Sequence, residues 1–163
     1  MLLLILLFCF VRGQGFDVKK ATGHWYQVAD VPQFYEMKYS SCTTATYEFI
    51  ATNHTIGIVN RAYDKKSQTA CSVYGNGVPT PGAENIWNLE LYGSSCNSFP
   101  FLPISSQLVW QNVLGQHQYQ LAQLTGPGNA FYILSRKPSL SPRLWEALFA
   151  TFPNLVPTDQ SNC

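Results

Sequence analysis

Cysteine side chains are the first residues of this chain that could perform chemistry. Four of them, Cys42, Cys71, Cys96 and Cys163, lie in the body of the chain, and Cys9 lies in an apolar N-terminal run. None of their spacings is that of a CxxC zinc or redox motif. An even set of four in an oxidising compartment predicts two disulfides, for which three connectivities exist.

The histidines and carboxylates do not combine into a catalytic or metal-binding pattern. His24, His54 and His117 have no metal-ligand spacing, so we expect them to be surface or hydrogen-bonded residues and expect no metal. Neither a Ser/His/Asp set nor a carboxylate pair can be assembled from only nine acidic residues. The sequence therefore predicts neither a cofactor nor an enzymatic activity.

A single N-x-S/T sequon, Asn53-His54-Thr55, offers a modification site. It falls between two predicted strands, where a secreted chain can be glycosylated. We predict glycosylation of Asn53, with a plain turn asparagine as the alternative.

The composition predicts one domain with a large aromatic interior. The chain has 163 residues, of which 46% are hydrophobic, 14% aromatic and only 12% charged, with a net charge of +1. Nucleic acid is not an expected partner, because no stripe of Lys or Arg is present.

The first 15 residues read as a secretory signal. The apolar run Leu2–Val11 is about half the length needed to cross a bilayer, and small residues follow it. We expect cleavage near Gly13 to Gly15, a mature domain of residues 16–163, secretion to the extracellular space and no transmembrane segment. Loss of Arg12 would leave nine basic residues against nine acidic ones.

Apolar and polar residues alternate over most of the remaining chain, as in strands with one buried face. This alternation predicts an all-β fold, an eight-stranded antiparallel up-and-down barrel whose interior is wide enough for one small ligand. The predicted strands are Trp25–Ala29, Thr44–Phe49, Thr55–Tyr63, Ser67–Tyr74, Ile86–Tyr92, Gln107–Gly115, Gln118–Leu121 and Ala130–Arg136.

One α-helix is predicted after the last strand. Ser141 is a candidate N-cap and Pro142 suits the first turn. We expect the helix to pack outside the barrel on Phe131 and Ile133, which leaves Tyr132, Leu134 and Arg136 on the inner face. Its apolar stripe consists of Leu144, Trp145, Leu148, Phe149 and Phe152.

The same alternation assigns residues to the barrel interior. Asn60 falls on an apolar face, where its amide must pair with a neighbour such as Tyr132 or meet a polar group of a ligand. Leu91, Leu108 and Leu121 are also expected to point inward. The predicted ligand contacts are Tyr47, Phe49, Ile58, Asn60, Trp87, Leu89, Trp110, Tyr119 and Tyr132.

Three motifs together resemble the lipocalin family over essentially the whole mature chain. They are Gly23-His24-Trp25-Tyr26 with Phe16-Asp17-Val18 before it, the run Tyr132–Arg136 with Pro138 and Leu140 after it, and the tail Thr158–Cys163. The resemblance is greatest to the branch that contains apolipoprotein D and the insect bilin-binding proteins. It implies the calycin barrel and a structural role for Gly23, Trp25 and Arg136, with the guanidinium lying across the indole.

The resemblance also implies how the cysteines pair. Cys42 and Cys163 match the family disulfide that ties the C-terminal tail to the second strand. Cys71 and Cys96 remain, and they bracket the Pro79–Gly82 turn nearly symmetrically, so we predict that they form a cross-strand bridge.

The chain departs from the family pattern at two places. The middle motif, usually Thr-Asp-Tyr, is replaced by Trp110-Gln111-Asn112-Val113, and the N-terminal cysteine of the second common bridge is absent.

The function that the resemblance implies is a secreted carrier of a small hydrophobic molecule, namely a lipid, steroid, retinoid or tetrapyrrole. We expect the protein to be a monomer or a weak dimer. One alternative is a lipocalin that acts on a protein partner or cell-surface receptor through the loops Gln33–Ser41 and Gly93–Ile104. The other is an isomerase, which would need a free cysteine thiolate in the cavity.

Overall fold

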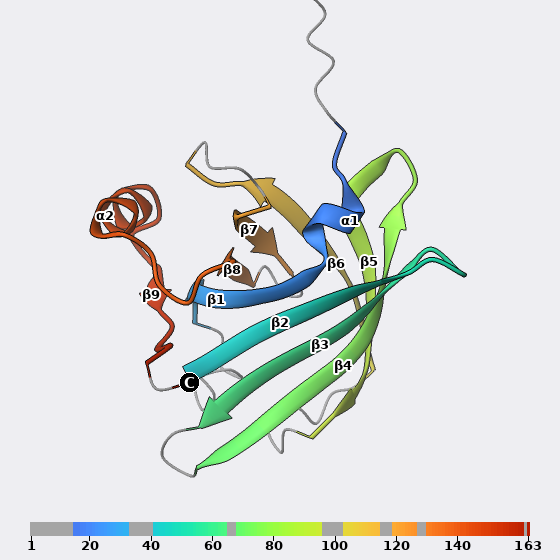
Figure 1. The fold of residues 1–163 in the computed structure, drawn as a ribbon, viewed down its shortest axis with the longest axis horizontal. Helices are drawn as coiled ribbons and strands as arrows, with labels where there is room; N and C mark the ends of the chain where they lie inside the picture. The colour runs from blue at the N-terminus through green and yellow to red at the C-terminus, as the bar shows by residue number, and fades with distance from the viewer. Residues whose placement is uncertain are drawn as a thin grey trace, which may run out of the picture.

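The protein folds into one curved sheet with a helix at its side (Figure 1). A computed structural model describes residues 15–32, 41–64, 68–95, 103–114, 119–126, 130–161 and 163. The elements in these ranges are α1 (Val18–Ala21), β1 (Gly23–Val31), β2 (Ser41–Ile50), β3 (Thr55–Asp64), β4 (Thr69–Thr80), β5 (Ala83–Ser94), β6 (Ile104–Asn112), β7 (Leu121–Thr125), β8 (Phe131–Ser135), α2 (Pro142–Thr151) and β9 (Val156–Pro157).

The sheet closes into a barrel. Neighbouring strands follow the order β2-β3-β4-β5-β6-β7-β8-β1-β9, and β1 also pairs with β2, which joins the two sides. Every one of these pairings is antiparallel. The predicted eight-stranded up-and-down barrel with one C-terminal helix is therefore confirmed. The short strand β9 was not predicted, because two residues carry no detectable alternation.

The two ends of the barrel differ. We call the end that carries α1 and the turns at 51–54 and 81–82 the closed end, and the opposite end the far end (Figure 1). The side chain of Asp17 caps α1 by accepting from the backbone N–H groups of Lys19 and Lys20. Ala21 at the end of α1 is fully buried, so α1 covers the closed end.

Strands β4 and β5 are longer than the sequence predicts. Inward and outward residues continue to alternate through Gly75 and Gly77 on β4, where the absence of side chains hides the pattern. A Cβ at Gly75 would lie 2.6 Å from the backbone oxygen of Glu90 and 2.6 Å from a methyl group of Leu91. Glycine is therefore required for this close approach of the two strands.

Helix α2 packs on the outside of the barrel, as predicted. The Ser141 side chain accepts from the backbone N–H of Leu144, and Leu148 is completely buried. Phe131 and Ile133 of β8 belong to the cluster beneath the helix. Phe149 departs from the predicted stripe, because it is 37% exposed and stacks on Trp145 at 5.5 Å between ring centroids.

The prediction that Leu121 points inward is wrong. Leu121 packs in the cluster beneath α2, whereas Ala122 and Leu124 belong to the interior cluster. Tyr119, from which the alternation was counted, lies in the turn before β7 and not in the strand. The two-residue period therefore does not extend from Tyr119 to Leu121.

None of the helices in the described ranges is long and apolar enough to cross a membrane.

Candidate ligand-binding site

An aromatic cluster fills the closed end of the barrel. Trp25, Trp87 and Trp110 are each at most 1% exposed. The ring centroid of Trp110 lies 5.5 Å from that of Trp25 and 4.9 Å from that of Trp87. Tyr47 lies 5.4 Å from Trp87, and Phe16, which the sequence analysis did not assign, lies 5.9 Å from Trp110.

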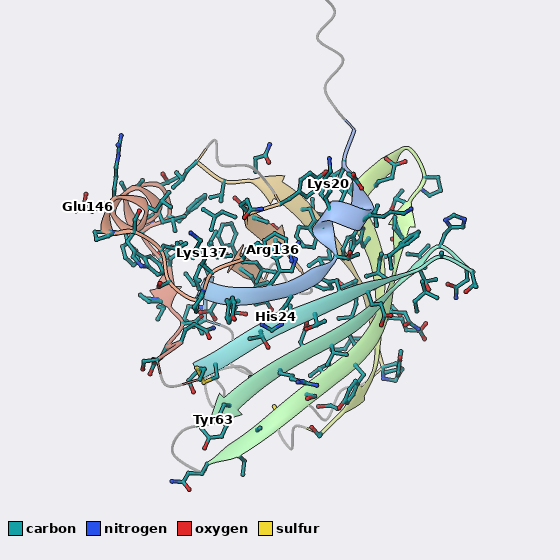
Figure 2. All side chains as sticks on the ribbon, viewed as in Figure 1. Lys20, His24, Tyr63, Arg136, Lys137 and Glu146 are labelled. Carbon is teal, nitrogen blue, oxygen red and sulfur yellow. A yellow bond between two sulfur atoms is a disulfide. The ribbon has the colours of Figure 1, made fainter. Side chains whose placement is uncertain are left out.

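Arg136 closes this cluster from outside. Its guanidinium carbon lies 3.7 Å from the Trp25 ring centroid, so the predicted cation–π contact is present. The guanidinium also donates to four backbone oxygens, and it lies between β1 and α1 in Figure 2. These oxygens belong to Lys20 (2.9 Å), Thr22 (2.7 Å), His24 (2.7 Å) and Tyr119 (3.2 Å).

Two features describe the surroundings of Arg136, namely its desolvation and the backbone of Gly23 beside it. Desolvation lowers the pKa of Arg136 from its ordinary value, and its acceptors keep its donors satisfied. Gly23 has a φ of +97°, and a Cβ there would lie 3.2 Å from a terminal nitrogen of Arg136. A side chain at Gly23 would therefore strain the backbone and push against the guanidinium.

The predicted ligand contacts divide into two groups. Tyr47, Trp87, Trp110 and Tyr119 contact the aromatic cluster at the closed end. Phe49 also lies at this end, beneath the ammonium group of Lys19 at 5.7 Å and next to the His54 ring. Alternation identified their inward direction but contained no information on their height along the barrel axis.

The second group has no ring contact with that cluster. Ile58, which pairs with Tyr47 across β2 and β3, and Leu89 are buried, and Tyr132 packs against the same interior cluster. A separate apolar cluster continues the inner face toward the far ends of β3 to β6, and the sequence analysis did not propose its members as ligand contacts. It consists of Cys71, Val73 and Leu91, with Ala62 and Ile104 packed against them.

Asn60 is a polar residue on this inner face. Its cross-strand neighbours are Ala45 on β2 and Val73 on β4, both buried and apolar. The side-chain oxygen Oδ1 is buried and has no hydrogen-bond partner among the residues that the structure describes. The structure therefore does not contain a pairing of this oxygen with a neighbour such as Tyr132, which was one of the two expected alternatives.

Asp30 also faces the interior, which the sequence analysis missed. It pairs with Tyr132 across β1 and β8, and paired residues of antiparallel strands point to the same face. Its neighbours Ala29 and Val31 pack in the outer cluster beneath α2. A bulge between Gln27 and Ala29 shifts the alternation by one residue, so counting from Trp25 predicts the wrong face for Asp30.

The environment of Asp30 is poorly solvated. Burial raises the pKa of its carboxyl group from 3.8 to about 6. The Asp30 side chain has no ion pair among the described residues. The salt bridge present in these ranges joins Lys20 to Asp17 instead.

A disulfide joins the tail to the barrel. Cys42 on β2 is bonded to Cys163, with 5.4 Å between their Cα atoms, as the family resemblance implied. Cys71 is also disulfide-bonded. Its predicted partner Cys96 lies outside the described residues, so this pairing stays a prediction.

The remaining candidates lie on the surface or outside the described ranges. Asn53 is exposed in the turn before β3 and accepts a hydrogen bond from Thr55 at 2.6 Å. His117 and most of the two predicted recognition loops, namely residues 33–40 and 96–102, fall outside the description. Within the described ranges, no group of three or more His, Cys, Asp or Glu residues could hold a metal ion.

Comparison with known proteins identifies the type of domain. A family model described as "Lipocalin-like domain" matches residues 16–154. A search of curated proteins returned no match.

Three solved structures have the same fold. The cockroach allergen Per a 4 is 20% identical, with a TM-score of 0.65 over 91% of each chain. Insecticyanin from the tobacco hornworm Manduca sexta is 15% identical, with a TM-score of 0.67 over 90% of this chain and 82% of its own. The amine-binding protein of Rhodnius prolixus, solved with tryptamine, is 13% identical, with a TM-score of 0.60 over 85% of this chain and 75% of its own.

Proposed function

The chain belongs to the lipocalin family, and on this premise we propose that it is a secreted carrier that binds a small hydrophobic molecule non-covalently inside the barrel. The observation that carries this proposal is the buried Asn60 Oδ1 without a partner on an apolar inner face. A buried acceptor without a donor costs about 1 to 3 kcal/mol. A bound molecule with a hydrogen-bond donor removes this cost.

The proposed binding region lies between the aromatic cluster and the far end. The aromatic residues at the closed end form its floor and exclude water. The apolar side chains above them supply contact area, and Asn60 supplies orientation. Its walls are Ile58, Leu89 and Tyr132 together with Ala62, Val73, Leu91 and Ile104.

Secretion is part of the proposal. Residues 1–15 would be a cleaved signal and residues 16–163 the mature domain. The Cys42–Cys163 disulfide supports this, because such bonds form and persist in oxidising compartments. We also propose glycosylation of Asn53, which its exposed turn would allow.

We propose, on the basis of the tail Thr158–Cys163, that the chain belongs to the branch with apolipoprotein D and the insect bilin-binding proteins. Its Thr158 is buried, and the amide of Gln160 donates to the backbone oxygens of Gln27 at 2.8 Å and Thr43 at 2.7 Å. The tail therefore seals the junction of β1 and β2 beside the disulfide.

Thiolate-dependent isomerisation is not supported. All three described cysteines, Cys42, Cys71 and Cys163, are disulfide-bonded, so none of them offers a thiolate.

Titration with Nile red, a neutral dye that brightens in apolar surroundings, tests the proposal. We expect saturable binding of one dye per chain. Leu91→Trp should weaken binding at least about tenfold by filling the proposed site, because Leu91 is a buried inner residue. Its neighbour Tyr92 is 56% exposed, so Tyr92→Trp should bind as the wild type does.

Near-ultraviolet circular dichroism would establish that both variants are folded. The proposal is wrong if the wild type does not bind the dye saturably, or if folded Leu91→Trp binds it with unchanged affinity.

A further inference from the structure

Two hydrogen-bond acceptors occupy the inner face of the barrel. One is the carboxylate of Asp30, which shares this face with Tyr132. The other is the unpartnered Oδ1 of Asn60. They stand on β1 and β3, and the residues around them on this face are apolar or aromatic.

No cationic side chain among the described residues forms an ion pair with Asp30 or a hydrogen bond with Asn60 Oδ1. In the described ranges, the cationic groups that lie over rings of the interior are all at the closed end, where Lys19 lies over Phe49, Lys20 over Tyr119, and Arg136 over Trp25 with its donors engaged. The residues that face Asp30 across its strand pairs are Tyr132 on β8 and Val156 on β9, neither of which has a cationic side chain.

Building on the proposed carrier function, we propose that the ligand is a hydrophobic amine, whose ammonium group binds Asp30 while a donor on the same molecule meets Asn60. A half-buried carboxylate attracts a cation more strongly than one in water, because the surrounding dielectric is low. The same field repels fatty acids and other carboxylates.

Protonation of Asp30 should control this binding. The pKa of about 6 means that the carboxylate is ionised at pH 7.5 and largely neutral at pH 5. Alkylamines stay protonated throughout this range, so only the protein changes charge between the two conditions.

The indole N–H of Trp110 is the one buried side-chain donor of the described interior that lacks a partner. It lies in the aromatic cluster at the closed end, where Trp110 is 1% exposed. Because the group is neutral, it can meet a ligand acceptor without changing the preference for a cation.

Displacement of Nile red by decylamine, 1-decanol and decanoate tests the inference, since these probes share one chain and differ in charge. At pH 7.5 we expect decylamine to bind about tenfold more tightly than decanol, and decanoate to bind most weakly. Asp30→Asn should reduce the affinity for decylamine to that for decanol. Glu90→Gln, which removes an exposed charge from β5, should preserve the order.

A second measurement avoids any variant. Wild-type affinity for decylamine should fall about fivefold between pH 7.5 and pH 5, because about a tenth of the Asp30 carboxylates stay ionised, while affinity for decanol stays constant. Equal or tighter binding of decanoate, or an amine preference that survives both Asp30→Asn and pH 5, would overturn the amine assignment while leaving the carrier function intact. Failure of Nile red itself to bind would overturn both.

Discussion

Asn60 and Asp30 lower the stability of the empty barrel. The Asn60 oxygen is buried without a donor among the described residues, and the Asp30 carboxylate is ionised at neutral pH in a poorly solvated position. A ligand that donates a hydrogen bond to Asn60 and brings a positive charge to Asp30 would offset this cost in free energy. Two residue-scale predictions follow from this, and both can be measured without knowing the ligand.

Replacing Asn60 by Leu should stabilise the empty protein. The substitution keeps the number and branching of the side-chain heavy atoms and removes the unpartnered amide oxygen, so the free energy of unfolding should rise by about 1 to 2 kcal/mol. Urea denaturation measures this difference. The matched control is Asn112→Leu at an exposed strand position, which should change stability little. A destabilised Asn60→Leu variant would mean that the amide is satisfied.

The effect of Asp30→Asn on stability should depend on pH. The pKa of Asp30 is raised to about 6 in the folded protein, so the folded state binds this proton more tightly than the unfolded state. The free energy of unfolding therefore decreases as the pH rises from about 4 through 6. Asp30→Asn should stabilise the protein by about 2 kcal/mol at pH 8, after allowance for partial solvation, and by nothing below about pH 3.5. A variant effect independent of pH would contradict this.

At the scale of elements, Arg136 connects segments that are distant in the sequence. From the end of β8 it holds backbone oxygens of α1, its C-cap, β1 and the turn before β7. The closed end is therefore assembled around one planar, multidentate cation.

Arg136→Lys should destabilise the protein although the charge is kept. An ammonium group cannot span several oxygens and the Trp25 ring together, so we expect a loss of about 2 to 3 kcal/mol in urea denaturation. Arg61 is exposed on β3, and Arg61→Lys is the matched control with no expected change. Equal stability of the two variants would show that the guanidinium geometry is unimportant.

Element types were predictable from the sequence, but local register was not. Strand alternation and the Ser141 cap identified the barrel and α2. Gly75 and Gly77 concealed the length of β4, and the bulge on β1 reversed the face of Asp30. Alternation also carries no information on depth, so it could not predict that Trp87 and Trp110, two of the predicted ligand contacts, share one cluster with Trp25.

At the scale of the molecule, the chain is held at its end by a long-range crosslink. The Cys42–Cys163 disulfide spans 121 residues and holds β9 and the tail against β1. Long loops gain the most from such constraint of the unfolded chain.

Removing this bond with Cys42→Ser and Cys163→Ser together should lower the free energy of unfolding by about 2 to 4 kcal/mol. Amide exchange should also accelerate at Thr158, whose N–H donates to the backbone oxygen of Val28 at 2.9 Å. Faster exchange confined to the tail, with unchanged global stability, would contradict the assigned role.

Native mass spectrometry of the protein titrated with Nile red tests the central claim, binding inside the barrel, most directly because it counts bound molecules per chain. The account predicts a single 1:1 complex that saturates and that is lost in folded Leu91→Trp but retained in Tyr92→Trp. Absence of any complex, or unsaturable binding of several molecules that is equal in both variants, would contradict it.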